Sequence, residues 1–320
     1  MKKYDITALG EILIDYTPLP KSKAGMQAFE QNPGGAPANV LACAAKLGFK
    51  TAFIGKIGCD MQGDFLRSTL EDAGIETRCL ISDPDFFTTL AFVSLSDSGE
   101  RSFSFARKPG ADTRLCASEV DIKLIEESRI FHFGSLSLTD NPAREATIFA
   151  LEQAKKSDII ISYDPNYRPL LWKTREDAME KMRSVLKYVD VIKISDEETQ
   201  LVSGESEPVL AAKKLIELGI PLVAVTLGCE GAIVANKEGH ARIAPRKVTA
   251  IDTTGAGDAF WGGFLYSLGL SGKKPSQVSL DEAASFGEFA NAVASICVQG
   301  RGAIPSMPSL DEVELLLGNK

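Results

Sequence analysis

The sequence predicts an α/β fold in which a doubly wound, mostly parallel central sheet is flanked by helices. Short β-rich apolar runs alternate with amphipathic helical stretches through most of the chain. With 320 residues, of which 44% are hydrophobic and 24% charged, the chain is long enough for a full core. No internal repeat, low-complexity tract or Pro/Gly/Ser-rich linker divides it, so we expect a single domain over residues 1–320.

Five apolar runs are expected to form strands of the main sheet, at residues 51–57, 130–133, 159–163, 191–194 and 222–227. Polar clusters follow three of them, at residues 164–168, 195–198 and 226–230. Ligands bind at the carboxyl ends of strands in open α/β sheets. These three clusters are therefore candidate parts of a binding site.

A predicted hairpin departs from this alternation. Residues 89–95 and 101–105 flank Ser-Asp-Ser-Gly-Glu, and Arg-Ser-Phe-Ser-Phe alternates with period two. Together with residues 12–29, the hairpin could form a small sheet apart from the main one. We interpret about 12–33 and 86–110 as a lid, although periodicity alone favours a simple edge hairpin. Phe103 and Phe105 share one strand face, where they would either cover a ligand or pack between subunits.

The charge and cysteine content restrict the protein's partners and location. A formal net charge of −8 argues against binding nucleic acid. The six cysteines include no CxxC pair, which indicates reduced thiols. The N-terminus lacks the apolar core of a signal peptide, and no apolar run reaches the length of a membrane span. We therefore expect a cytoplasmic protein without a membrane partner.

The most informative segment is Ile-Asp-Thr-Thr-Gly-Ala-Gly-Asp-Ala-Phe at 251–260, where a glycine-rich turn leads into the apolar helical stretch 259–268. Small residues let backbone N–H groups approach a phosphate, and the helix macrodipole favours the anion. Asp258 either caps the helix or acts as a base on a hydroxyl group. Taken alone, the segment favours capping. There is no GxxxxGK[ST] loop and no GxGxxG after a strand.

A second glycine-rich segment, Asn-Pro-Gly-Gly-Ala-Pro-Ala-Asn, occupies residues 32–39. Pro37 suits the first position of a helix, and Gly48 suits its end. A tight turn before a helix accounts for the glycines and the proline but not for Asn39. The Asn39 amide could hydrogen-bond vicinal hydroxyl groups of a ligand.

Together, the segments 34–39 and 252–260 resemble the two signatures of the ribokinase-like carbohydrate kinases, the PfkB family. Segments 10–15, 53–56, 131–135, 164–168 and 171–172 are similar to fructokinases of bacteria and plants. The resemblance implies a ribokinase-like fold and transfer of a phosphoryl group from ATP to a sugar, with D-fructose giving D-fructose 6-phosphate. It also implies that the lid excludes water and supports a homodimer.

The resemblance assigns the chemistry of phosphoryl transfer to the signature at residues 252–260. Asp258 is the expected base, and the amides of Gly255, Ala256 and Gly257 form the expected anion hole. Arg168 supplies a fixed positive charge near the transferred phosphate. The expected sugar contacts are Asp15, Gly34, Gly35, Asn39, Phe105, Arg107 and Asn166.

The resemblance assigns the nucleotide to a second set of residues: Thr226, Gly228, Asn291, Ser195 and Glu198. The family's N-x-x-E motif, which organises Mg²⁺ and its waters, appears here as Ser195-Asp196-Glu197-Glu198. Serine thus stands in place of asparagine, and Glu198 is expected to hold Mg²⁺ through water. The alternative is a solvated helix start, where three acids favour the dipole.

Many relatives also hold a monovalent cation, usually K⁺, beside the anion hole. The matching positions are Asp252, Thr254, Cys297, Gly300, Gly302 and Ser306. Hard oxygen ligands around one carboxylate suit such an ion.

Three alternatives to fructose phosphorylation remain at this stage. One is 2-keto-3-deoxygluconate kinase activity, in which Arg107 and Arg168 would meet the substrate carboxylate. Another is ribokinase-type activity on ribose or another furanose. The third, from a different class, is a sugar-binding protein without turnover, which would have no need of a base at Asp258.

Overall fold

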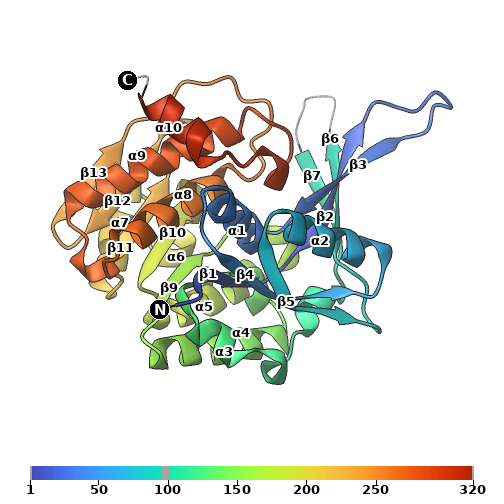
Figure 1. Ribbon diagram of the computed structural model, residues 1–320, viewed down its shortest axis with the longest axis horizontal. Helices are drawn as coiled ribbons and strands as arrows, with labels where there is room; N and C mark the ends of the chain where they lie inside the picture. The colour runs from blue at the N-terminus through green and yellow to red at the C-terminus, as the bar shows by residue number, and fades with distance from the viewer. Residues whose placement is uncertain (1, 96–100, 319–320) are drawn as a thin grey trace.

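The computed structural model describes residues 2–95 and 101–318. These residues form a nine-stranded sheet and a separate four-stranded sheet, and Figure 1 shows the smaller sheet projecting from one side of the body. From one edge to the other, the large sheet contains β13 (Gly239–Ile243), β12 (Ala232–Asn236), β11 (Leu222–Thr226), β10 (Val191–Ser195), β9 (Ile160–Asp164), β8 (Ser128–Gly134), β1 (Tyr4–Leu9), β4 (Thr51–Gly58) and β5 (Ile75–Asp83).

The large sheet is parallel from β11 to β5, and β12 and β13 extend it in antiparallel fashion. Its strands are apolar on both faces because helices cover both. In β11, for example, Leu222 and Ala224 face one core cluster while Val223 and Val225 face the other. The five predicted strands correspond to β4, β8, β9, β10 and β11, so the expected fold class is confirmed. The antiparallel pair β12–β13 was not predicted.

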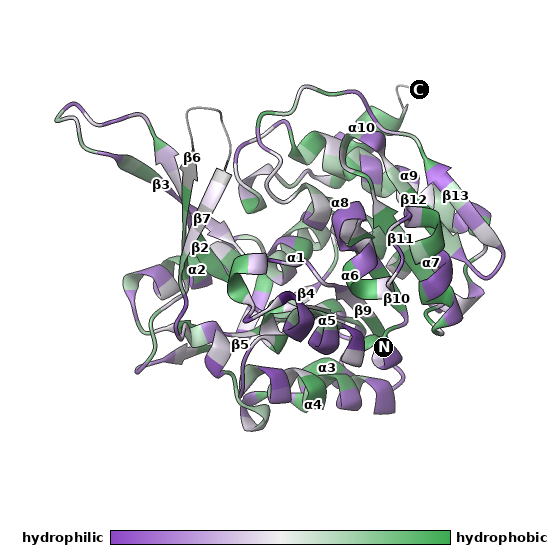
Figure 2. Cartoon of the chain, turned by 180° about the vertical axis from the view of Figure 1, so that it is seen from behind, coloured by the Kyte–Doolittle hydropathy of each residue, from purple (hydrophilic) through white to green (hydrophobic). Residues whose placement is uncertain are grey.

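Two groups of helices enclose this sheet. Helices α1 (Ala36–Lys46), α2 (Met61–Asp72), α8 (Ala256–Ser271), α9 (Leu280–Cys297) and α10 (Leu310–Gly318) cover one face. Helices α3 (Ile122–Glu126), α4 (Ala143–Lys156), α5 (Arg175–Ser184), α6 (Thr199–Ser203) and α7 (Pro208–Glu217) cover the other. Figure 2 shows hydrophobic strands inside and hydrophilic residues on outer helices such as α5. Within residues 2–95 and 101–318, no helix has the length and apolar character needed to cross a bilayer.

The small sheet has the strand order β3 (Ala28–Gly34), β2 (Leu13–Leu19), β6 (Leu90–Leu95) and β7 (Arg101–Ala106). The predicted hairpin is present, since β6 and β7 pair in antiparallel fashion from Leu90↔Ala106 to Leu95↔Arg101. The connection at 96–100 lies outside the described residues. We call these four strands the lid sheet, and the covering role that the name implies remains a prediction.

The two faces of the lid sheet differ in character. Asp15 pairs with Ala91, which pairs with Phe105, so these three residues share one face. On the opposite face, Tyr16 stacks on Phe92 with ring centroids 5.2 Å apart, and Phe29 meets both rings edge-on. Phe29 and Phe92 remain 42% and 38% exposed. The lid sheet therefore carries polar and aromatic groups on one face and an open aromatic cluster on the other.

Candidate active site

The carboxyl ends of the parallel strands converge on the start of α8. β9 ends at Asp164, β10 at Ser195 and β11 at Thr226. Figure 1 shows α8 beside α1, and the two helices share one core cluster. Open α/β folds bind their ligands in a crevice outside the carboxyl ends of the strands, so we call this edge of the sheet, around the start of α8, the crevice.

Asp258 lies in the first turn of α8 and is buried. Its Oδ2 accepts a hydrogen bond of 2.7 Å from Nδ2 of Asn39, and its Oδ1 accepts one of 3.3 Å from Nδ2 of Asn166. The N-cap of α8 is Gly255, and no side chain caps this helix end. Burial raises the pKa of Asp258, while Lys193 and the Asn39 hydrogen bond oppose the rise. The geometry therefore supports a proton acceptor at this position rather than a capping residue.

The turn before α8 requires glycine at position 255. Gly255 has a φ of 78°, in the left-handed region, and a Cβ there would lie 2.5 Å from Cβ of Ala303. The amide of Ala256 donates to the carbonyl of Thr253 at 3.2 Å. The first amides of a helix lack intrahelical acceptors, which suits the binding of an anion at this helix start. An anion hole at residues 255–257 remains a prediction.

The glycine-rich segment at residues 32–39 brings the backbone close to Asp15. A Cβ at Gly34 would collide with Oδ2 of Asp15, and a Cβ at Gly35 would lie 2.5 Å from the carbonyl oxygen of Glu11. Gly35 also has a φ of 111° and is the N-cap of α1. Helix α1 begins at Ala36, so Pro37 is its second residue rather than the predicted first. Gly48, with a φ of 105°, follows the helix end as expected.

Asp15 and Arg168 approach the same crevice from two different elements. Burial raises the pKa of Asp15 to about 6; the charge of Arg168 opposes this rise, and that of Asp258 adds to it. Arg168 is exposed and follows β9. The structure therefore brings together residues from four separate stretches of the chain: Asp15, Asn39, Asn166 with Arg168, and Asp258.

The loop after β9 holds Asn166 in a strained backbone conformation. Its φ is 44°, which is uncommon for a residue other than glycine. Oδ1 of Asp164 accepts the Asn166 amide at 3.1 Å, and Oε1 of Glu198 accepts the Tyr167 amide at 2.6 Å. Two carboxylates thus fix the loop that directs Asn166 toward Asp258.

The acidic run after β10 divides into two parts. Asp196 and Glu197 are exposed, as a solvated helix start predicts, whereas Glu198 is only 5% exposed. Oε2 of Glu198 accepts the Ser195 amide at 2.8 Å, within a capping box that includes the Ser195 side chain. The backbone amide of residue 195 therefore anchors Glu198, although serine stands where the family pattern has asparagine. A buried carboxylate held in this way suits a hydrated Mg²⁺ ion.

Lys193 is a site residue that was not predicted from the sequence. Its ammonium lies 2.8 Å from Oδ2 of Asp164, and the two side chains are 6% and 1% exposed. A Cβ added to Gly257 would lie 2.9 Å from Nζ of Lys193. The signal was a lysine inside the otherwise apolar strand Val-Ile-Lys-Ile-Ser.

Arg107 requires a correction. Its Nε donates to Asp112 at 2.7 Å, its Nη1 to Oγ1 of Thr139 at 3.0 Å, and its Nη2 to the carbonyl of Leu136 at 2.9 Å. The side chain is buried, so the guanidinium serves the interior rather than the expected substrate. Phe105, by contrast, shares the lid-sheet face of Asp15.

The expected nucleotide residues lie at the β10–β11 side. Oγ1 of Thr226 donates to the carbonyl of Ile194 at 3.4 Å, and Gly228 has a φ of 56°. Nδ2 of Asn291, on α9, donates to the carbonyl of Ala244 at 2.6 Å. These contacts order the backbone on this side of the crevice, and a nucleotide contact at these residues remains a prediction.

The expected cation positions form one loop cluster. Asp252 accepts the amide and hydroxyl of Thr254 at 3.0 and 2.7 Å through Oδ1, and the amide of Gly302 at 3.1 Å through Oδ2. Oγ of Ser306 donates to the carbonyl of Arg301 at 2.9 Å, and a Cβ at Gly300 would collide with that hydroxyl. Cys297 ends α9 and is buried, which raises the pKa of its thiol to about 12. Backbone carbonyls of this cluster are hard oxygen donors.

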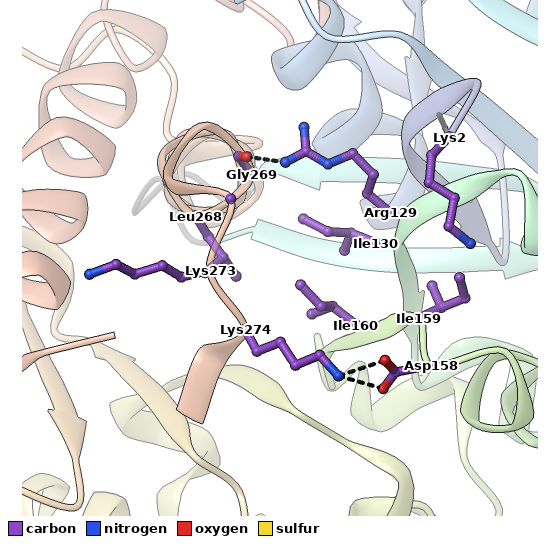
Figure 3. A pocket seen from close by; sticks show the side chains of 11 residues that line it. Lys2, Arg129, Ile130, Asp158, Ile159, Ile160, Leu268, Gly269, Lys273 and Lys274 are labelled. Carbon is purple, nitrogen blue, oxygen red and sulfur yellow. Dashed lines mark hydrogen bonds and ion pairs between the residues drawn. The ribbon is translucent and has the colours of Figure 1, made fainter. Parts of the chain in front are cut away.

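A separate hollow of about 170 Å³ lies near the C-terminal end of α8 (Figure 3). Arg129 donates to the carbonyl of Gly269, and Lys274 forms an ion pair of 2.6 Å with Asp158. Lys273 likewise pairs with Glu282. These cations neutralise acids and meet the negative end of the helix dipole. The hollow is therefore distinct from the crevice that contains Asp258.

The comparisons with known proteins agree with this geometry. Residues 3–310 match the sequence model of a protein family described as pfkB family carbohydrate kinase. The chain is 40% identical over 319 residues to Probable fructokinase-5 of Arabidopsis thaliana, with 98% of each chain covered.

Solved structures of fructokinases are also similar. One with bound ATP from Xylella fastidiosa has a TM-score of 0.89 at 32% identity, covering 100% of this chain and 99% of the other. One from Vibrio cholerae O395, bound to fructose, ADP and calcium, has a TM-score of 0.87 at 31% identity, covering 98% and 99%. A double mutant of the Vibrio protein contains fructose, ADP and potassium.

A buried carboxylate at an anion-binding helix start, set at the carboxyl edge of an open α/β sheet, defines an enzyme that transfers a phosphoryl group to a small hydroxyl compound. With a family match over nearly the whole length, the chain belongs to the pfkB family of carbohydrate kinases.

Proposed function

We propose that the protein is an ATP-dependent fructokinase that converts D-fructose to D-fructose 6-phosphate. The observation that carries this proposal is the Asp258 carboxylate at the start of α8, held by the amides of Asn39 and Asn166. Fructose is the sugar in the Vibrio relative's structure, and ATP is the nucleotide in the Xylella one. A further support is Oδ1 of Asn39, a buried acceptor without a hydrogen-bond partner. A sugar hydroxyl would satisfy it.

In this proposal, Asp258 takes the proton of the sugar hydroxyl while the oxygen of that hydroxyl forms a bond to the γ-phosphorus of ATP. The bond from the γ-phosphorus to the bridging oxygen breaks, and ADP leaves. The amides of residues 255–257 and the charge of Arg168 stabilise the negative charge on the transferred phosphoryl oxygens. Asp15 and Asn39 orient the sugar from the lid sheet and α1. The lid sheet limits water, which would otherwise accept the phosphoryl group.

Glu198 would hold Mg²⁺ through water, together with backbone groups near Ser195. The ion would neutralise charge on the nucleotide phosphates. The cluster around Asp252 would hold K⁺, with carbonyls of Cys297, Gly300 and Gly302 as donors and Thr254 and Ser306 beside them. The potassium in the Vibrio relative supports this part of the proposal.

The site supports fructose over 2-keto-3-deoxygluconate. That substrate carries a carboxylate, yet the guanidinium of Arg107 is already engaged by three protein groups. Of Arg107 and Arg168, only Arg168 is then left to bind the substrate carboxylate. Arg168 lies beside the carboxylates of Asp15 and Asp258. Like charges in such a site oppose one another.

The decisive experiment is to measure ADP formation from Mg-ATP with fructose, 2-keto-3-deoxygluconate, ribose, glucose and mannose. We expect turnover with fructose, loss of turnover in Asp258→Asn, and normal turnover in the control Asp281→Asn, at the exposed start of α9. A preference for another sugar would support the kinase activity but contradict fructose as the substrate. Sugar-induced thermal stabilisation without any turnover would favour a binding protein.

We also propose a homodimer that forms through the lid sheet. The aromatic cluster of Tyr16, Phe29 and Phe92 is the apolar surface that supports it, because it lies on the face opposite to Asp15. Phe92→Glu should yield monomers in sedimentation velocity. The control Met61→Glu places the same charge on an exposed apolar residue of α2, outside the lid sheet, and should leave the dimer intact.

The proposed location is the cytoplasm. All six cysteines are free, and Cys43, Cys79 and Cys297 are buried, which suits a reducing compartment. Fractionation of cells that express the native chain would test the location.

A further inference from the structure

The lysine in β10 is unusual for its surroundings. Lys193 is 5% exposed, and its Nζ lies 2.8 Å from Oδ2 of Asp164. A buried ion pair contributes little net stability, because desolvation offsets the attraction between the charges. A residue that only filled this strand position could be apolar, like its neighbours Ile192 and Ile194. The lysine therefore requires another explanation.

The ammonium of Lys193 lies against the helix turn that carries the base. A Cβ added to Gly257 would lie 2.9 Å from Nζ, so the absence of a side chain at residue 257 makes room for the charge. Lys193 also reaches the base through a second route. Its partner Asp164 accepts the Asn166 amide, and the Asn166 side chain donates to Asp258.

The base is otherwise surrounded mainly by acids. The positive groups that act on Asp258 are Lys193 and Arg168. Arg168 is exposed, so solvent screens its charge, whereas Lys193 is buried and screened far less. The groups that oppose ionisation of Asp258 or face it from neighbouring elements are Glu198, Asp164 on β9, Asp15 on β2, and the thiols of Cys43 on α1 and Cys297 on α9.

We propose that Lys193 is a positioning residue for phosphoryl transfer, whose buried charge against Gly257 keeps Asp258 ionised among these acids. The inference rests on the proposed kinase function. Burial raises the pKa of Asp258, and the charge of Lys193 lowers it. Burial alone would lower the pKa of Lys193, but Asp164, Glu198 and Asp258 outweigh it and raise the pKa above its usual value.

The test compares the two members of the ion pair, because they act on Asp258 with opposite sign. Lys193→Met removes a positive charge, so the acid limb of the kcat/KM profile should move to higher pH by about one to three units. Asp164→Asn removes a negative charge and should leave the limb in place or move it to lower pH. Lys193→Arg should retain the profile of the unaltered protein.

Lys193→Met and Asp164→Asn each break the same buried ion pair. The loss of stability that they share is measured by their melting temperatures. If Lys193→Met does not fold, the double variant Lys193→Met with Asp164→Asn leaves no unpaired ion. The acid limb of its kcat/KM profile should still move to higher pH, by less than that expected for Lys193→Met alone. The inference would be overturned if the acid limb did not move in Lys193→Met or, should that variant not fold, in the double variant. Equal shifts in Lys193→Met and Asp164→Asn would overturn it as well. Failure of the unaltered protein to turn over any sugar would instead overturn the proposed function.

Discussion

Nδ2 of Asn39 donates a hydrogen bond of 2.7 Å to Oδ2 of Asp258, joining residues that are 219 positions apart in the chain. Each residue belongs to one of the two glycine-rich segments, so the contact joins the starts of α1 and α8. The amide orients the carboxylate and leaves its own carbonyl oxygen without a partner. The two segments therefore form one site, and its parts can be altered one at a time.

Asp258→Asn should lower kcat for fructose by about 10² to 10⁴, because it removes a positioned base. Sugar binding should persist, since Asp15 and Asn39 are unchanged. The measurement is initial-rate ADP release together with the thermal shift caused by fructose. The exposed acid Asp281, altered to asparagine, serves as the control. Retention of more than a tenth of the rate would contradict the assigned role.

Asn39→Ala should move the acid limb of kcat/KM to higher pH. The Asn39 hydrogen bond lowers the pKa of Asp258, so its loss raises that pKa. The base is inactive when protonated, so activity is lost as pH falls through a higher value than before. Rates from pH 5 to 9 measure the shift. Asn141→Ala, which removes an exposed amide bonded to Glu145, should not shift the limb.

Gly255→Ala should reduce both stability and turnover. The alanine would need a left-handed backbone, at about 1–2 kcal/mol, and its Cβ would lie 2.5 Å from that of Ala303. Overpacking of this kind costs a further 1–3 kcal/mol or so. Gly272→Ala is a matched control at the other end of α8, because Gly272 has a φ of 65° and no heavy atom within 4 Å of the added Cβ. It should lose stability alone; equal losses in the two variants would contradict the close contact at residue 303.

Much of this site could be predicted from local sequence, and the reasons differ by residue. Gly255 and Asp258 stand in one short segment whose composition already indicates an anion-binding helix start. The strand ends at Asp164 and Ser195 follow from apolar runs and the geometry of parallel sheets. The pairing of β6 with β7 follows from period-two alternation.

Other features depend on partners that no local pattern reveals. Lys193 looked like part of an apolar strand, and its role depends on Asp164 and Gly257. The family resemblance placed Arg107 at the substrate, yet its guanidinium pairs with Asp112, which lies only five residues away in the chain. Whether a polar side chain faces the crevice or the interior is decided by tertiary packing, so the sequence alone could not distinguish these outcomes.

Arg107→Met should destabilise the protein by about 3–5 kcal/mol, because it leaves the buried Asp112 carboxylate without its partner. KM for fructose should not change at a temperature where the variant is folded. Urea unfolding and steady-state kinetics provide the two measurements. The double variant Arg107→Met with Asp112→Leu removes both charges and should recover part of the loss. A raised KM without loss of stability would return Arg107 to the substrate site.

Replacement of sodium by potassium should increase the rate of ADP formation if the Asp252 cluster holds a cation beside the anion hole. Asp252 orders Thr254 and Gly302 through three hydrogen bonds, so it fixes the loops whose carbonyls would bind the ion. Asp252→Asn should remove most of the difference between the two salts, because the carboxylate charge is lost and the amide group cannot accept on both sides. Asp281→Asn, at the exposed start of α9, should keep the full difference. Equal rates of the unaltered protein in sodium and potassium at constant ionic strength would reject the cation site while leaving Asp258 and the phosphoryl transfer untouched.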